Sequence, residues 1–519
     1  MLRETVSTAV VGGGVSGLYS AWRLAKASGP VSSPVSLNVY EASDRLGGRL
    51  DTVKVPPLNC SVEMGAMRFT ISQLFVSSLL AYLNVPTEVF KDSTLQYMFL
   101  RDTPIPMSPS GPLGPVPYRL AGIESPFPFA LFVQAMERAV PGALSFTPDQ
   151  WAVVIQKFQL RGRPLWQWGF WNLLQTFLSN EAYQLVFEGL GEQSVSANWN
   201  AAFAMPMMCG IINDAEKQNG ILRPTGGWVT LVDKLAEGIR ANSGCVVETQ
   251  TELRGIRKTD DADFPLELRF AGPREQEKIV AAKSVILALP REALERIEFG
   301  REICPLSKTV RLLEQVVQIP AFKLYAAYDS PWWSTYCGWT DGYSISDLPI
   351  RQVYYGAGQA GGANDTGRIL MASYADFTSV PFWTGLIGAG AAPTRSLFQE
   401  RSGAGGPLDL MLEFVNAQLR QMHGILPELP KPIWSAYVDW TRGNYGAGWH
   451  AWQPGLNPVE AVPRMRQPFD GAPIYICGET FSYLQGWVEG ALSSAELMLE
   501  EKFSLPRPDW LPSSLYLGP

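Results

Sequence analysis

The sequence predicts an α/β fold, in which the chain of a Rossmann-like domain is interrupted by a mixed-sheet domain and a helical domain. Three observations support this prediction. A β-branched strand at residues 8–11, a glycine-rich turn and an apolar helix follow one another near the start of the chain. Strand-like segments return at residues 245–290 and at residues 473–477. Between them, residues 129–222 have apolar positions at helical spacing, and residues 324–377 contain further strand patterns.

The glycine-rich turn at residues 12–17 reads Gly-Gly-Gly-Val-Ser-Gly. Gly12 permits the tight turn out of the strand, Gly14 lets the backbone approach a pyrophosphate, and Gly17 lets helix and strand pack closely. The N-terminus of the following helix offers N–H donors and a positive dipole end to phosphates. A chain with 48 glycines produces such motifs by chance, but here the strand and helix around the turn indicate a dinucleotide site.

Glu41 follows the second predicted strand, residues 36–40. A carboxylate at this position can accept two hydrogen bonds from an adenosine ribose, and its charge repels the 2′-phosphate of NADP. Gly47 and Gly48 then let the chain turn back beside the phosphates, and Arg49 brings a planar cation to them. The acid and the basic loop strengthen the prediction of a dinucleotide site.

Composition and charge exclude several classes of protein. The 519 residues suggest two to four domains, and 46% hydrophobic residues are enough to fill their cores. The net charge, 42 − 49 = −7, argues against a nucleic-acid partner, and no apolar run reaches the ~18 residues of a membrane span. The two histidines leave little material for a metal site. Six scattered cysteines and a first strand within about seven residues of the start predict free thiols, no signal peptide and a cytoplasmic location.

Residues 41–49 resemble a signature segment of the flavin amine oxidase family, which includes monoamine, polyamine and L-amino acid oxidases. Residues 475–491 resemble the closing motif of that family, a Gly-Glu pair followed by an aromatic residue. The resemblance covers nearly the whole chain. It implies one FAD bound between the two ends of the chain, in the amine oxidase (p-hydroxybenzoate hydroxylase-like) fold. The implied cofactor-binding residues are Gly12, Gly14, Val15, Ser16, Gly17, Glu41, Ala42, Arg45, Gly48, Arg49, Gly65, Ala66, Met67, Arg68, Leu253, Trp440, Gly478, Glu479, Gly486, Trp487 and Val488.

Within that implied FAD site, Glu479 is expected to accept hydrogen bonds from the ribityl chain or the ribose. The last helix, which residues 486–492 start and which runs over residues 493–502, is expected to direct its positive end at the N1/O2 edge of the flavin. Three interleaved domains and a tail are expected: residues 1–72, 223–315 and 456–505 for FAD binding, residues 73–120 and 316–455 for substrate binding, residues 121–222 as the helical domain, and residues 506–519 as the tail.

Three residues are expected to act on the substrate. Arg68 lies in a Gly-Ala-Met-Arg segment similar to one in L-amino acid oxidases, whose arginine grips the substrate carboxylate with two parallel hydrogen bonds. Tyr374 matches a tyrosine whose hydroxyl lies beside that arginine. Lys323, alone in an apolar strand, matches a lysine that holds a water at flavin N5 and assists the reaction with oxygen. The structural alternatives are a surface ion pair, a core aromatic residue and an edge-strand lysine, respectively.

The stretch from Trp440 to Trp452 is rich in aromatic residues. In the family it holds a tryptophan against the flavin, matched by Trp440, and one wall of an aromatic cage, matched by His450. The opposite wall is matched by Trp487, which follows Gly486. The alternative for His450 is a hydrogen-bonded core histidine. Monoamine oxidases attach FAD through a cysteine just before the cage residue, and Trp449 in that place predicts non-covalent FAD.

We therefore expect FAD-dependent oxidative deamination of L-amino acids, with Arg68, Tyr374, Lys323 and Trp487 as catalytic residues. Hydride passes from Cα to flavin N5, and the products are a 2-oxo acid, ammonia and hydrogen peroxide. A tryptophan-rich cage favours bulky apolar or aromatic substrates, and no carboxylate is found that would hold a basic side chain. The expected partners are the L-amino acid, molecular oxygen and, from the resemblance, a second copy in a homodimer.

Three other functions stay open. An amine or polyamine oxidase is favoured if Arg68 points away from the flavin. A flavin monooxygenase that forms an amide from an L-amino acid differs in its peroxide yield. A non-enzymatic FAD-binding protein is excluded if an L-amino acid bleaches the yellow protein without oxygen.

Overall fold

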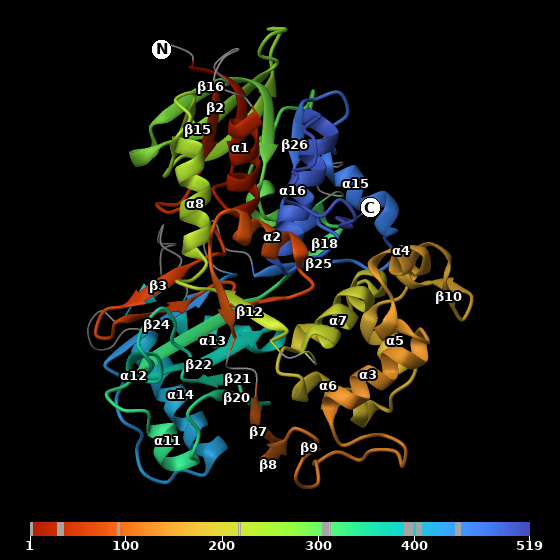
Figure 1. The fold of residues 1–519 in the computed structure, drawn as a ribbon, viewed down its shortest axis with the longest axis vertical. Coiled ribbons are helices and arrows are strands. Elements are labelled where there is room, and N and C mark those ends of the chain that lie inside the picture. Colours follow the sequence, from red (N-terminus) through yellow and green to blue (C-terminus); the bar gives the residue numbers. More distant parts are fainter. Residues whose placement is uncertain are drawn as a thin grey trace.

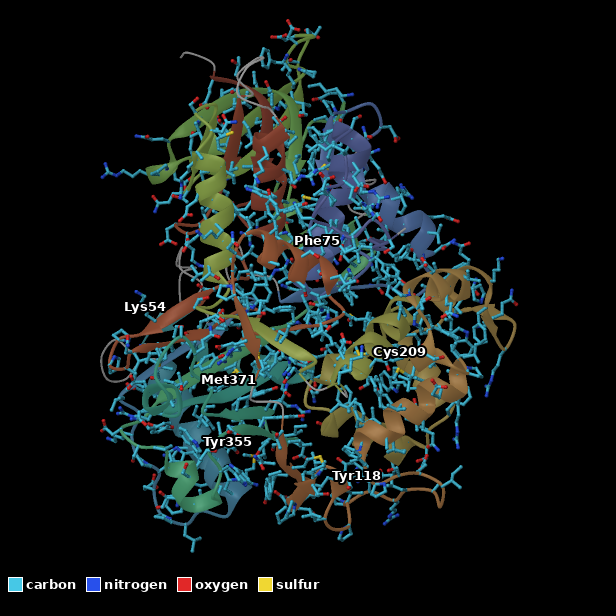
Figure 2. All side chains as sticks on the ribbon, in the orientation of Figure 1. Lys54, Phe75, Tyr118, Cys209, Tyr355 and Met371 are labelled. Carbon is cyan, nitrogen blue, oxygen red and sulfur yellow. The ribbon has the colours of Figure 1, made fainter. Side chains whose placement is uncertain are left out.

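The computed structural model describes residues 4–27, 36–90, 94–215, 217, 219–303, 311, 313–388, 398–400, 407–441 and 448–518, with only the backbone at residues 398–400. Residues 442–447 of the aromatic stretch and one of the six cysteines, Cys304, lie outside these residues. The five described cysteines are free thiols, as predicted, and Cys209 lies among the helices in Figure 2. Among the described residues, no helix is long and apolar enough to cross a membrane.

An eight-stranded sheet joins segments from the start, middle and end of the chain. Its parallel part has the order β13-β2-β1-β16-β26, and the first half of β16 also pairs with β15 in an antiparallel meander with β14 and β17. These strands are β1 (Glu4–Val11), β2 (Leu37–Tyr40), β13 (Cys245–Glu248), β14 (Glu252–Lys258), β15 (Leu266–Ala271), β16 (Glu277–Leu287), β17 (Glu298–Phe299) and β26 (Ile474–Ile476). The predicted Rossmann-like pattern is confirmed, because β1 and β2 run parallel on either side of the turn that contains the glycines.

Three helices pack against this sheet: α1 (Val15–Ala27), α8 (Val229–Arg240) and α16 (Val488–Phe503). Helix α1 contacts both of the others, and Figure 1 shows α8 on one side of it and α16 on the other. All residues of α1 from Val15 to Ala25 are buried. The N-terminal and C-terminal helices of the chain therefore lie side by side against the sheet.

A nine-stranded mixed sheet has the order β23-β24-β19-β22-β21-β20-β7-β8-β9, with β20 and β7 parallel. Its strands are β7 (Leu95–Leu100), β8 (Thr103–Ser108), β9 (Gly111–Pro112), β19 (Ala321–Ala327), β20 (Gly342–Ser346), β21 (Gln352–Tyr355), β22 (Ile369–Asp376), β23 (Phe398–Glu400) and β24 (Trp434–Asp439). Helices α13 (Val380–Ile387) and α14 (Pro407–His423) pack beside it, and the ring of Trp383 stacks on Phe322 of β19. The predicted mixed sheet is confirmed.

The predicted helical region forms five α-helices to the side of the mixed sheet (Figure 1). They are α3 (Pro128–Ala139), α4 (Pro148–Lys157), α5 (Phe170–Gln175), α6 (Asn180–Gly189) and α7 (Ala201–Ala215). Side chains at the N-termini fix two of their starts: Thr147 and Gln150 form a capping box on α4, and Ser179 caps α6.

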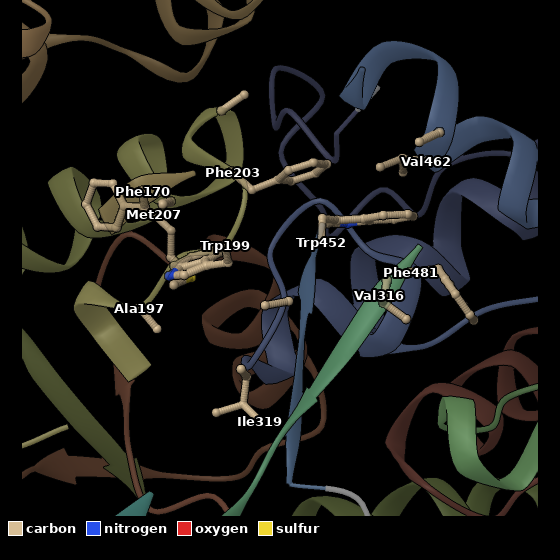
Figure 3. Packing of buried hydrophobic residues seen from close by; sticks show 14 of the residues in the cluster. Phe170, Ala197, Trp199, Phe203, Met207, Val316, Ile319, Trp452, Val462 and Phe481 are labelled. Carbon is tan, nitrogen blue, oxygen red and sulfur yellow. The ribbon is translucent and has the colours of Figure 1, made fainter. Parts of the chain in front are cut away.

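A short antiparallel pair connects this helical region to the rest of the molecule. Strand β25 (Trp449–Trp452) pairs with β18 (Val316–Ile319). The ring of Trp452 stacks on the ring of Phe203 of α7 (Figure 3), and their centroids are 5.4 Å apart. Trp199 meets Trp449 edge to face at 5.6 Å. Aromatic residues of the helical region therefore hold in place the aromatic stretch that is predicted to flank the substrate.

The remaining elements are short and connect these layers. They are α2 (Leu74–Tyr82), α9 (Arg291–Leu294), α11 (Trp332–Cys337), α12 (Ala363–Thr366), α15 (Pro458–Arg466), the pairs β3 (Thr52–Val55) with β4 (Cys60–Glu63) and β10 (Gln159–Leu160) with β11 (Arg163–Pro164), and the small sheet of β5 (Phe69–Thr70), β12 (Ile221–Pro224) and β6 (Thr87–Val89).

Candidate active site

One cavity lies where the carboxyl ends of β1, β2 and β16 meet the mixed sheet, and it encloses about 1710 Å³ with the solvent at its mouth included. Most of the predicted site residues line it: Gly12, Gly14, Val15, Ser16, Glu41, Ala42, Arg45, Gly48, Arg49, Gly65, Ala66, Leu253, Lys323, Tyr374, Trp440, Gly478, Glu479, Gly486, Trp487 and Val488. Four predicted residues are not among the lining residues: Gly17, Met67, Arg68 and His450.

The three motif glycines of the first turn have different reasons to be glycine. Gly12 has a φ of +105°, and a Cβ on Gly17 would lie 2.0 Å from the carbonyl oxygen of Gly12. A Cβ on Gly14, in contrast, would meet no protein atom within 4 Å, and this residue lines the cavity. Gly12 and Gly17 therefore serve the fold, whereas Gly14 leaves open space beside the N-terminus of α1, where a pyrophosphate fits.

Glu41 is largely occupied by its own loop. Its Oε2 accepts the N–H of Gly13 at 2.7 Å, and its Oε1 accepts the N–H and the hydroxyl of Ser43 at 2.8 and 2.7 Å. A carboxylate has about four acceptor positions, so one is left on Oε2. The structure thus leaves one hydrogen bond for a ribose where the sequence predicted two, and it adds Ser43, which the sequence analysis missed.

The basic loop supports itself in a similar way. Arg45 donates to the carbonyl oxygens of Leu46, Gly48 and Leu50 and pairs with Asp51 at 3.2 Å. The loop is joined to the glycine turn, because the N–H of Gly47 donates to the Gly13 oxygen at 2.8 Å.

Glu479 accepts four hydrogen bonds from the protein. Arg49 Nη1 donates to Oε2 at 2.7 Å and His450 Nδ1 lies 3.0 Å from it, while the N–H groups of His450 and Gly486 donate to Oε1 at 2.9 and 2.8 Å. The prediction that Glu479 bonds the ribityl chain or the ribose is therefore not matched by this arrangement, because its acceptor positions are filled. Burial alone would raise the pKa of Glu479, but Arg49 and His450 lower it below its ordinary value.

The wall position predicted for His450 is wrong. Its side chain is fully buried and lies between Glu479 and Glu292, whose Oε2 is 3.2 Å from His450 Nε2. Its neighbour Trp449 lines the cavity instead, together with Trp487. Successive side chains of a strand point to opposite faces, so a shift of one residue exchanges the buried and the cavity-facing position in β25. Gly486, the residue before Trp487, lies directly beside Trp449, because a Cβ on Gly486 would be 3.3 Å from the Trp449 ring.

Lys323 of β19 reaches the cavity from the mixed sheet. Its ammonium donates to the carbonyl oxygens of Gly65 and Glu63 at 2.5 and 3.2 Å, and it lies 3.6 Å from the sulfur of Met67. Burial, together with the nearby charge of Arg68, lowers the pKa of Lys323 to about 7. The lysine is thus poised to gain or lose a proton near neutral pH.

The buried acid Glu63 lies near Lys323 and acts on its charge. Glu63 accepts from the N–H of Trp228 at 3.0 Å and from Gln359 at 2.5 Å, and burial raises its pKa to about 7. Its charge works against the lowering of the Lys323 pKa. The sequence analysis passed over Glu63, although a lone acid at the end of a buried strand is the same kind of signal as Lys323.

Arg68 lies next to the cavity, among tyrosines and one acid. Its Nη1 donates to the hydroxyl of Tyr354 at 3.4 Å, and its Nη2 is 3.9 Å from Glu192. Burial alone would lower the pKa of Arg68, but Tyr354, Glu192 and Tyr374 raise it above the ordinary value. Tyr374 lines the cavity, and its ring lies 5.1 Å below the Lys323 ammonium. The structure therefore brings Arg68, Tyr374 and Lys323 together.

Glu192 is the carboxylate that the sequence analysis did not find. It precedes the short 3₁₀ turn Gln193–Ser196, and its charge acts on Arg68, Lys323, Tyr354 and Tyr374. It lies in the helical region, more than a hundred residues along the chain from Arg68, Lys323 and Tyr374, and no local sequence pattern distinguishes it.

Comparison with known proteins agrees with this architecture. The family model described as flavin containing amine oxidoreductase matches residues 15–497. Aplysianin-A of Aplysia kurodai is 25% identical over 96% of this chain and 90% of its own length, and the L-amino-acid oxidase of Mus musculus is 25% identical over 93% and 69%. A structure of putrescine oxidase bound to putrescine has the same fold, with a TM-score of 0.68 at 18% identity over 97% of this chain and 100% of that one. The chain belongs to the flavin-containing amine oxidoreductase family.

Proposed function

We propose that the protein is an FAD-dependent L-amino acid oxidase, which converts an L-amino acid to its 2-oxo acid and releases ammonia and hydrogen peroxide. The observation that supports this most strongly is the guanidinium of Arg68. Its side chain is 25% exposed, and among the described residues its ion-pair partner Glu192 is 3.9 Å away. At that distance the ion pair lacks a hydrogen bond, so N–H donors of Arg68 stay available for a carboxylate in the fork geometry.

FAD fits the space that the chain leaves for it. The open volume at Gly14, the N-terminus of α1 and the free acceptor position on Glu41 suit a pyrophosphate and one ribose hydroxyl. We propose non-covalent FAD, because the residue before the cavity-facing Trp449 is Gly448 rather than a cysteine. When bound, FAD supplies a two-electron acceptor at N5, and oxygen reoxidises the reduced cofactor and is itself reduced to hydrogen peroxide.

The roles of the chain's own residues follow from their positions. Arg68 and Tyr374 bind the substrate carboxylate and orient Cα toward the cavity interior, and proximity supplies much of the rate. Lys323 lends a positive charge to the reaction with oxygen, and its third N–H donor, which faces the Met67 sulfur, is the one that can hold a water instead. Trp449 and Trp487 give apolar walls that favour a bulky apolar or aromatic side chain. We also propose that the protein acts as a homodimer.

Pairs of substrates test this proposal. Each L-amino acid is compared with the amine that lacks its carboxylate, for example L-phenylalanine with phenethylamine, by peroxide release and by anaerobic bleaching of the yellow protein. We expect bleaching by the amino acid, with one peroxide and one ammonia per turnover, and little reaction with the amine. A peroxide yield far below the substrate consumed would indicate a monooxygenase instead, and no bleaching by any substrate would indicate a binding protein.

An amine or polyamine oxidase is the second candidate, and Glu192 is the observation that favours it. A carboxylate near Arg68 repels a substrate carboxylate and attracts an ammonium. Efficient oxidation of a diamine, and its loss in Glu192→Gln with gain of activity on amino acids, would favour this function over the first.

A further inference from the structure

His450 has a charge state that its neighbours dictate. Nδ1 lies 3.0 Å from Glu479 Oε2, and Nε2 lies 3.2 Å from Glu292 Oε2. Ionised carboxylates only accept hydrogen bonds, so both ring nitrogens donate and the ring carries two protons. The side chain is fully buried, which makes this a positive charge held between two acids inside the protein rather than a surface ion pair.

The ionisable groups around the ring agree with this charge state. Burial alone would lower the pKa of His450, but Glu479 and Glu292 raise it above 6.5, against a smaller opposing effect of Arg49. His450 in turn lowers the pKa of Glu292, in spite of that residue's burial. Thr480 adds a hydroxyl 3.3 Å from Nδ1. The two acids and two cations balance one another, so the net charge of the buried cluster is zero.

Glu479 connects this cluster to both tryptophan walls. Its Oε1 accepts the N–H of His450, the residue after Trp449, at 2.9 Å. The same oxygen accepts the N–H of Gly486, the residue before Trp487, at 2.8 Å. One oxygen therefore fixes the position of the backbone next to both tryptophans.

We propose that the His450 imidazolium is a positioning residue, which donates to the same oxygen of Glu479 as Arg49 and thereby holds Trp449 and Trp487 in place at the wall of the cavity. His450 itself does not line the cavity. Loss of one of its two protons removes the positive charge and leaves one ring nitrogen unable to donate, so the neutral ring holds Glu479 less strongly and both walls loosen as the pH rises. The inference needs a flavin in this cavity but does not depend on which substrate is oxidised.

Two amide substitutions separate the two sides of the ring. In His450→Asn the amide nitrogen takes the place of Nδ1 and can still donate to Glu479, whereas in His450→Gln it takes the place of Nε2 and donates to Glu292 only. The apoprotein of each variant is titrated with FAD, and binding is followed by the quenching of tryptophan fluorescence. We expect FAD to bind roughly 10-fold more weakly to His450→Gln, and within about 3-fold of the unchanged protein to His450→Asn. Equal affinity of both variants, or weaker binding by His450→Asn, would overturn the proposal.

Glu292→Gln tests the charge without changing the ring. Its side chain is 22% exposed, so this neutral substitution leaves the fold in place. Since Glu292 raises the pKa of His450, its loss lowers that pKa, and FAD affinity should decline with rising pH at a lower pH than in the unchanged protein. Identical pH profiles would contradict the role of the imidazolium.

The ring can also be observed directly, because the chain has only two histidines. Histidine labelled with ¹³C at Cε1 gives one signal from His450 and one from His423, whose pKa burial lowers to about 4. We expect His450 to be charged at pH 7 and His423 to be neutral. His423→Gln assigns the signals and is the matched control, since it removes a half-buried histidine that bonds Tyr355 in the mixed sheet and should leave FAD affinity and its pH profile unchanged. A neutral His450 at pH 7 would overturn the proposal.

Discussion

The two ends of the cavity are built in different ways. At the end where we propose that the nucleotide binds (the nucleotide end), the turn of Gly12, Gly14 and Gly17 uses backbone alone, and every partner lies within a short stretch of sequence or in an adjacent strand. At the opposite end, Arg49 reaches Glu479 across 430 residues, and Arg68 faces an acid from the helical region. A backbone site is therefore fixed by local sequence, whereas a side-chain site depends on the whole fold.

The largest effect is expected from a glycine at the nucleotide end. In Gly17→Ala the new Cβ would lie 2.0 Å from the Gly12 oxygen, so helix α1 must move away from β1. We expect a loss of about 4 kcal/mol or more in the free energy of unfolding, because backbone has to shift in a packed core. Thermal unfolding of the apoprotein measures it.

Gly14→Ala is the matched control, since its Cβ meets no protein atom within 4 Å. The apoprotein should unfold at the same temperature as the unchanged protein and yet bind FAD poorly, because the methyl group fills the space for the pyrophosphate. Normal FAD binding by Gly14→Ala would mean that the pyrophosphate lies elsewhere.

An effect of intermediate size is expected for Lys323→Met, at the opposite end of the cavity. This substitution keeps the size of the side chain and removes the charge. Anaerobic reduction of the flavin by substrate should continue, while reoxidation by oxygen slows roughly 100-fold, as for the loss of one electrostatic donor. Stopped-flow absorbance separates the two half-reactions, and a loss confined to the reductive half would contradict the proposed role.

The same lysine predicts a pH dependence. Burial lowers its pKa to about 7, so the ammonium is present below that pH and lost above it. Reoxidation should therefore slow as the pH rises through about 7, and Lys323→Met should lack this change. A pH profile shared by both proteins would assign the dependence to another group.

The smallest effect is expected in Ser43→Ala, back at the nucleotide end. Glu41 loses one of three protein donors, its hydroxyl partner at 2.7 Å, and keeps the two backbone N–H groups. FAD affinity should change by about 1 kcal/mol or less, since a single hydrogen bond with solvent access contributes little. Isothermal titration of the apoprotein measures this change, and a loss above tenfold would give Ser43 a direct contact with the cofactor.

The same contrast explains what could be predicted from the sequence. The strands and helix around Gly12–Gly17, the parallel sheet and the start of α16 follow from local patterns, and the structure has them within a few residues. The cavity lining at Gly14, Glu41 and Trp487 follows for the same reason. These features depend on backbone geometry and on the period of side chains along one element.

The misassigned features depend on long-range contacts. In β25 the prediction named His450 rather than Trp449 as the wall of the substrate cage. A resemblance in sequence does not give the strand register, so the cavity-facing residue can be wrong by one position. Glu192 could not be predicted, since only the packing of the helical region against the mixed sheet brings it to Arg68. Knowledge of the strand alternation alone would have corrected the first error but not the second.

The central claim is that Arg68 binds the substrate by its carboxylate, and steady-state kinetics of Arg68→Ala and Arg68→Lys test it most directly. With an L-amino acid as substrate, the account predicts that KM rises in Arg68→Ala by a factor equivalent to ~2–5 kcal/mol, and that the lysine variant recovers only part of this because it lacks the two-pronged contact. With the matching amine, Arg68→Ala should change little. Near-normal kinetics of Arg68→Ala on the L-amino acid would contradict the claim.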